Sequence, residues 1–136
     1  MINELKKLFK ETPEIAAAYL FGSAAAGEAV VNDLDILILP FSEADFYQID
    51  CALSTKIALA TGFETDKIDL IVFDLKMVKP DILFEAVNKG ILLTNKSPEL
   101  LTNKIEALSS YFLENEYWIK EKKRIMKERL EAFCAD

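Results

Sequence analysis

The fold is decided by residues 15–38, IAAAYLFGSAAAGEAVVNDLDILI, in which two apolar runs flank a stretch of small residues. Residues 15–21 form an unbroken apolar run that is short enough to predict a buried strand, which ends at Gly22. Residues 34–39 predict a second strand, which Pro40 closes. Residues 22–32 contain two glycines and predict a loop, with room for one helical turn after Ser23.

Outward from these strands, helical and strand patterns alternate. Periodicity and capping residues predict further helices at about residues 2–11, 43–60, 80–90 and 97–134, and further strands at 67–73 and 91–94, the latter at a sheet edge. Ser42 and Asp45 form a capping-box pattern for the second helix, and Cys51 within it is expected to pack in the core. The last segment fits one long helix or two helices with a break near Asn115.

The predicted class is α+β, with a mixed sheet flanked by helices. The length predicts a single domain over residues 1–136, with a core at about 12–95 and a C-terminal helical extension at about 98–134.

The composition removes several kinds of chemistry. The 136 residues include no histidine and two cysteines, Cys51 and Cys134. Without histidine, Ser-His-Asp and Cys-His catalysis and every zinc site that needs imidazole are excluded. Metal binding and acid–base chemistry therefore rest on carboxylates, whose oxygen atoms favour Mg²⁺ or Mn²⁺.

The same composition predicts the compartment and the partners. No segment approaches the roughly 18 apolar residues that a membrane span needs. The first residues lack the basic-then-apolar layout of a secretory signal, so we expect a cytoplasmic protein. The formal net charge of −7 should repel nucleic acid, which is therefore not an expected partner.

Three aspartates are the candidate catalytic and metal-binding residues. Asp33 and Asp35 bracket the start of the second strand, and residues two apart on a strand project from the same face. Asp69 stands alone in the apolar run 67–73 and can meet this pair if the second and third strands are neighbours. Carboxylates on an apolar sheet are costly to bury unless a cation neutralises them. The set therefore predicts a metal-assisted phosphoryl-transfer site.

Gly22 and Ser23 are the candidate nucleotide-binding residues. A glycine directly after a strand lets the backbone approach a ligand closely, and a serine hydroxyl can bond a phosphate oxygen. Taken singly, Gly22-Ser23 and Asn32-Asp33 are ordinary turns, and Asp69 is a partly exposed strand residue. The combination at this spacing favours a cradle for a triphosphate and a metal ion.

Together, these residues resemble the signature of the minimal nucleotidyltransferases of the DNA polymerase β superfamily. The matching segments are Tyr19-Leu20-Phe21-Gly22-Ser23, Gly27-Glu28, Asp33-Leu34-Asp35-Ile36-Leu37-Ile38 and Ile68-Asp69-Leu70. The resemblance covers about residues 15–75 and implies a nucleotidyltransferase fold. It further implies that Gly22 and Ser23 hold the triphosphate and that Asp33 and Asp35 bind metal ions. Asp69 would bind one metal ion and help to deprotonate the attacking hydroxyl.

Members of this family often act as antitoxins beside a helical HEPN ribonuclease toxin, and some transfer AMP from ATP to a tyrosine of that toxin. The resemblance therefore implies an antitoxin that uses ATP with Mg²⁺ or Mn²⁺ and forms a hetero-oligomer with such a toxin. Two alternatives stay open: an antitoxin that acts by binding alone, and an aminoglycoside-like nucleotidyltransferase that modifies a small molecule.

One departure from the family pattern motivates the first alternative. The family commonly has a basic residue directly after the Gly-Ser turn, where this chain has Ala24-Ala25-Ala26. A lost phosphate contact of this kind is worth about 1.5–3 kcal/mol.

The last helix carries a second candidate surface. Six bases, Lys120, Lys122, Lys123, Arg124, Lys127 and Arg129, lie among apolar residues between 111 and 133. A solvated helix face explains the bases better than RNA binding does. The apolar residues are too many for one small sheet to cover, which favours contact with another protein subunit.

Overall fold

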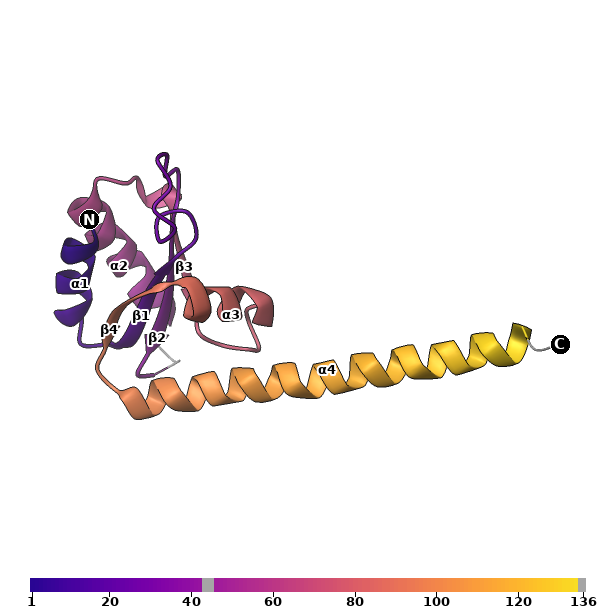
Figure 1. Ribbon diagram of the computed structural model, residues 1–136. Helices are drawn as coiled ribbons and strands as arrows, with labels where there is room; N and C mark the ends of the chain where they lie inside the picture. The colour runs from indigo at the N-terminus through magenta and orange to yellow at the C-terminus, as the bar shows by residue number, and fades with distance from the viewer. Residues whose placement is uncertain (43–45, 135–136) are drawn as a thin grey trace.

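The computed structural model (Figure 1) describes the backbone of residues 1–42 and 46–134, and their side chains except those of 47, 117–119, 122, 133 and 134. Helices and strands alternate along the chain. In order they are α1 (Ile2–Lys10), β1 (Ile15–Phe21), β2 (Leu34–Pro40), α2 (Phe46–Thr61), the short 3-10 helix η2 (Thr65–Lys67), β3 (Ile68–Val72), α3 (Pro80–Lys89), β4 (Ile91–Asn95) and α4 (Pro98–Cys134).

These elements confirm the predicted α+β class. Their ends differ from the predicted ones by about one residue, except at the start of α2, because Asp45 of the expected capping box lies outside the described residues. Of the two possibilities for the last segment, the single helix is the one observed, and α4 passes through Asn115 without a break. η2 was not predicted, since a turn of three residues has no periodicity to detect.

The four strands form one mixed sheet in the order β3-β2-β1-β4. β1 pairs antiparallel with β2 and with β4, and β2 pairs in parallel with β3. β4 therefore lies at a sheet edge, as expected, and β1 lies inside the sheet. Every residue of β1 is buried, which explains why its sequence is a continuous apolar run.

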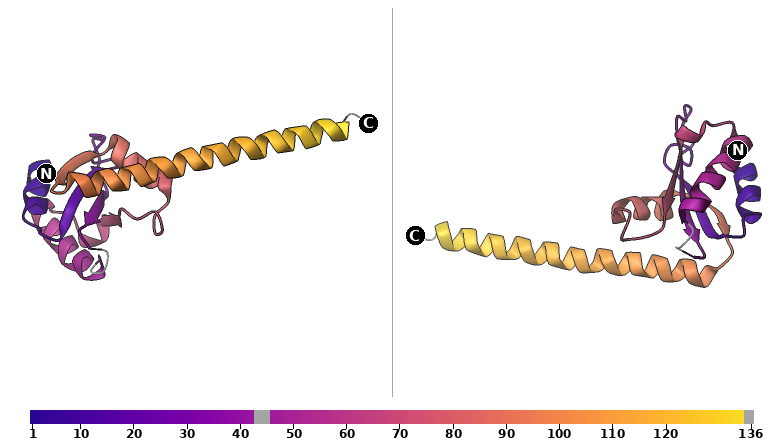
Figure 2. Two further views of the ribbon diagram at one scale, coloured as in Figure 1. Left: turned by 90° about the horizontal axis from the view of Figure 1, so that it is seen from below. Right: turned by 180° about the vertical axis from the view of Figure 1, so that it is seen from behind.

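Helices cover both faces of the sheet (Figures 1 and 2). One core cluster joins the sheet to α1 and α2 through residues such as Phe9, Ile36 and Ile57. The other joins it to α3 and the first turns of α4 through residues such as Leu37, Leu83 and Leu101. Because side chains alternate along a strand, Asp35 projects from the same face as Leu37, which is the face that α3 covers.

Two further observations concern the helices. Cys51 is exposed on α2, which corrects the expectation that it packs in the core. It lies on the side of the helix opposite Leu53 and Ile57, which are buried against the sheet. Within residues 1–42 and 46–134, no helix combines the length and the apolar character needed to cross a bilayer.

Candidate functional site

The parallel pairing of β2 with β3 brings two of the three aspartates together. Asp35 and Asp69 are register partners in adjacent parallel strands, so their side chains leave the sheet on the same face. This pairing meets the condition that the sequence left open for Asp69. Asp33 precedes β2 by one residue and is exposed, as Asp69 is, whereas Asp35 is half-buried.

The Gly-Ser turn lies directly beside Asp35. Phe21, the last residue of β1, is the register partner of Asp35, and Gly22 follows it. Gly22 has a φ of +71°, which side chains other than hydrogen rarely permit. A Cβ atom there would lie 2.5 Å from Oδ2 of Asp35. Two independent constraints therefore require glycine at this position: its backbone angle and the neighbouring carboxylate.

The loop after Gly22 begins with the helical turn that the sequence allowed. The Ala26 amide donates to the Gly22 carbonyl at 3.1 Å, and the Glu28 amide donates to the Ser23 carbonyl at 3.3 Å. Ser23 is half-buried in this turn, and Ala24 is buried in the core. At this departure from the family pattern, the turn therefore presents a small buried residue and no charge.

The electrostatics of Asp35 reflect this crowding. Burial is the largest cause that raises the pKa of Asp35 above its ordinary value. The negative charges of Asp69, Asp33 and Glu85 raise the pKa further. Glu85 is an exposed residue of α3, so its influence comes from the helix that covers this face.

The three aspartates line one shallow pocket of about 290 Å³, together with Asp66, Lys67 and Ile68. Among the residues that the structure describes, no three acidic or cysteine side chains are arranged to hold a metal ion as they stand. Coordination therefore requires side-chain rotation toward a common point. The donor set itself fits a hard divalent cation, because it offers carboxylate oxygens whose mutual repulsion a cation would relieve.

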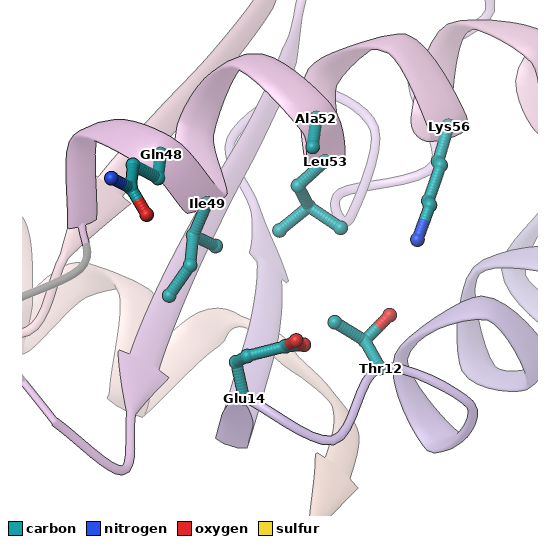
Figure 3. A pocket seen from close by; sticks show the side chains of 7 residues that line it. All are labelled: Thr12, Glu14, Gln48, Ile49, Ala52, Leu53 and Lys56. Carbon is teal, nitrogen blue, oxygen red and sulfur yellow. The ribbon is translucent and has the colours of Figure 1, made fainter.

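A second pocket lies on the opposite face of the sheet, between α2 and the turn after α1 (Figure 3). Its volume is about 230 Å³, and Leu53, Ile49 and Ala52 form its apolar wall. Glu14 is the one carboxylate in its lining, which also contains Lys56. This pocket lacks the paired acids that metal-dependent chemistry needs, so the carboxylate pocket is the candidate site.

Sequence reasoning missed three residues at the site. Asp66 and Lys67 belong to η2, which was not predicted, although Lys67 precedes Asp69 by two positions and this spacing was visible. Glu85 could not be found from the sequence, because its proximity to Asp35 depends on how α3 packs on the sheet.

Comparisons with known proteins support a specific family. The family model described as Polymerase beta, Nucleotidyltransferase matches residues 3–99. No curated protein matches the chain.

Several solved structures share the fold. A chain in the crystal structure of a toxin–antitoxin with AMP-PNP is 21% identical, with a TM-score of 0.63 over 95% of this chain and 98% of that chain. A chain in the structure of a tri-AMPylated Shewanella oneidensis HEPN toxin in complex with MNT antitoxin is 22% identical, with a TM-score of 0.58 over 95% of each chain. A chain in the crystal structure of the toxin–antitoxin MntA-HepT is 22% identical, with a TM-score of 0.57 over 88% of this chain and 94% of that chain.

The crowding of Asp35 generates a stability prediction. Its pKa is higher in the folded than in the unfolded chain, so its ionised form opposes folding at neutral pH and its protonation relieves this effect. In metal-free buffer, Asp35→Asn should therefore raise the free energy of unfolding at pH 7. The gain should shrink as the pH falls through the folded-state pKa of Asp35, where the wild type becomes protonated itself.

Urea unfolding monitored by circular dichroism at several pH values measures this difference. Glu11→Gln, which removes an exposed acid at the end of α1 on the opposite face of the sheet, is the matched control. An Asp35→Asn variant that is less stable than the wild type at pH 7 would contradict the prediction.

Proposed function

This chain belongs to the polymerase beta nucleotidyltransferase family, and from that premise we propose that it transfers AMP from ATP to a hydroxyl group of a partner protein. The observation that carries this proposal is the alignment of Gly22, Asp35 and Asp69 across three adjacent segments of the sheet. A phosphate-binding turn and paired carboxylates at one edge are the parts that metal-dependent phosphoryl transfer requires.

Each site residue has a role in the proposed reaction. Asp33, Asp35 and Asp69 would hold the divalent metal, Mg²⁺ or Mn²⁺, which neutralises phosphate charge when it is bound. The Gly22 backbone and the Ser23 hydroxyl, in the turn beside Asp35, would bind the phosphates of ATP. The acceptor oxygen forms a bond to the α-phosphorus, the bond from this phosphorus to the bridging oxygen breaks, and pyrophosphate leaves. The exposed carboxylate of Asp69 takes the proton of the hydroxyl.

Lys67 is the residue that we assign to the triphosphate in place of the missing base after Ser23. It is the one cation among the residues that line the carboxylate pocket. Ala24 is buried in the core, so the loop offers no equivalent charge at that position. The exposed ammonium of Lys67 can pair with phosphate oxygens beyond the three aspartates.

We further propose that the partner is a HEPN-type toxin and that the acceptor is a tyrosine of that toxin, so that the chain acts as an antitoxin. Its support is the shared fold with chains from toxin–antitoxin structures, one of which contains a tri-AMPylated HEPN toxin and another AMP-PNP. A tyrosine hydroxyl suits an open site, because the 290 Å³ pocket is shallow and leaves Asp69 exposed to an acceptor on another protein surface.

A specific observation favours one alternative, neutralisation of the toxin by binding alone. Among the described residues, the carboxylates are not arranged to hold a metal ion, and alanines follow the Gly-Ser turn where the family commonly has a basic residue. In that case complex formation, without modification, would suppress the toxin.

The first test separates these two functions. The purified chain is incubated with ATP, Mg²⁺ and the product of the adjacent gene as the candidate toxin, and the mass of that protein is measured. We expect addition of AMP by the wild type and a loss of at least about 100-fold in rate for Asp33→Asn combined with Asp35→Asn, because the metal site is lost. Glu11→Gln is again the control.

Two results would contradict the transferase proposal. One is an unmodified toxin that the wild type nevertheless inhibits, which is the outcome that binding alone predicts. The other is modification that survives in the double variant. Modification of an aminoglycoside but not of the toxin would instead support a small-molecule transferase.

The second test concerns Lys67. Lys67→Ala should raise the KM for ATP by about 10-fold to 100-fold, as expected for a lost charge-assisted phosphate contact, and Lys67→Arg should restore most of the affinity. Lys56→Ala, at the pocket on the opposite face, is the matched control. A Lys67→Ala variant with unchanged KM would remove Lys67 from the site without affecting the transferase proposal.

A further inference from the structure

α4 is much longer than the body of the protein requires. It has 37 residues, and its N-terminal part crosses the sheet while the remainder projects past α3 into solvent (Figures 1 and 2). Leu101, Leu108 and Phe112 pack against the core. Beyond Phe112 we call the helix the α4 extension, residues 113–134.

The apolar stripe on the helix face that packs against the core is interrupted at Asn115, and this face is apolar again at Met126 and Leu130. Leu101, Ile105, Leu108 and Phe112 follow the four-and-three spacing of one helix face, and Met126 lies two heptads after Phe112 on that same face. Leu130 follows Met126 by four positions. The side chains of Met126 and Leu130 are 64% and 62% exposed. The face that is buried in the body is therefore uncovered in the extension.

Such a helix gains little stability by itself. Isolated helices in water are marginal, and in proteins an amphipathic helix is stabilised mainly by packing of its apolar face. Three intrahelical ion pairs, Lys120–Glu116, Arg124–Glu121 and Arg124–Glu128, join exposed side chains and contribute little. A second surface is needed to cover the stripe.

The charge of α4 changes sign along its length. Residues 98–116 contain four acids and one base, whereas residues 120–129 contain six bases and two acids. Within the described part of the helix, Lys123, Lys127 and Arg129 take part in no ion pair. In an antiparallel pair centred near residue 120, residues 120–129 of one copy lie along residues 112–121 of the other, which contain three acids and one base. A parallel copy instead opposes the two basic stretches. Antiparallel helix dipoles add to this preference.

A groove lies where the partner's stripe would arrive. Its volume is about 550 Å³, and its walls include Asp81 of α3 together with Tyr111, Phe112, Glu116, Lys120 and Lys123 of α4. When Met126 of a second copy faces Asn115, the four-and-three spacing places its Leu130 at Tyr111 and its Arg129 at Phe112, beside Asp81 and Glu116. The groove thus offers an aromatic wall and two carboxylates.

We propose that two copies of this chain form a symmetric dimer through antiparallel pairing of their α4 extensions. The pairing keeps the two carboxylate pockets far apart, because the two bodies lie at opposite ends of the paired helices. The inference does not depend on the proposed transferase activity.

Sedimentation equilibrium of the purified full chain tests the pairing. We expect a dimer at tens of micromolar, and Met126→Glu combined with Leu130→Glu should raise its dissociation constant at least 100-fold. Because both side chains are exposed, the circular dichroism of the body should not change. Leu59→Glu on α2, where the side chain is 84% exposed, is the matched control and should remain dimeric.

A second measurement tests the orientation of the helices. Spin labels at position 120, near the predicted centre, should lie close together, whereas labels at position 102 should be more than about 50 Å apart at 1.5 Å per residue. Short distances at both positions would indicate parallel helices and overturn the proposal. A monomer that forms a complex only with a different protein, or a dimer that the double substitution leaves intact, would overturn it as well.

Discussion

The contact between Gly22 and Asp35 is the constraint on which the candidate site depends. The half-buried carboxylate of Asp35 lies so close to Gly22 that a Cβ atom at this position would collide with it. The turn can approach so closely because β1 and β2 are antiparallel neighbours, and Asp69 joins because β2 and β3 are parallel neighbours. The sheet order therefore gathers one turn and two acids from segments that are far apart in the sequence. Burial and then the repulsion from neighbouring acids raise the pKa of Asp35, and a divalent cation would relieve the repulsion.

Much of this arrangement could be predicted from the sequence. Continuous apolar runs and their bounding glycines and prolines predicted the strands. The two-residue spacing predicted Asp33 and Asp35 on one strand face; both line one pocket, but Asp33 precedes β2. The partner strand of Asp69 could not be derived, because strand order depends on packing between distant segments. Glu85 could not be predicted at the site for the same reason. η2, which contains Lys67, is too short to be recognised by sequence periodicity. Cys51 was wrongly expected to be buried, because the weak periodicity of α2 does not show which face of the helix packs on the sheet.

The chain combines two regions with different chemistry. The body is acidic and carries the carboxylate pocket, and the α4 extension carries a basic stretch at residues 120–129 and an uncovered apolar stripe. Because the stripe lies on the helix face that packs on the sheet, one helix both completes the core and presents a surface to another molecule. The assignment of the chain to the nucleotidyltransferase family rests on the body, whereas the account of its assembly rests on the extension.

The central claim is that the turn and the three aspartates form one site for a metal ion and a nucleotide. Calorimetric titration of a non-hydrolysable ATP analogue into the protein, with Mg²⁺ and then with EDTA, tests this claim most directly. The account predicts binding that weakens at least about tenfold when Mg²⁺ is removed or when Asp35 and Asp69 are both replaced by asparagine. Binding of equal strength under all three conditions would contradict it.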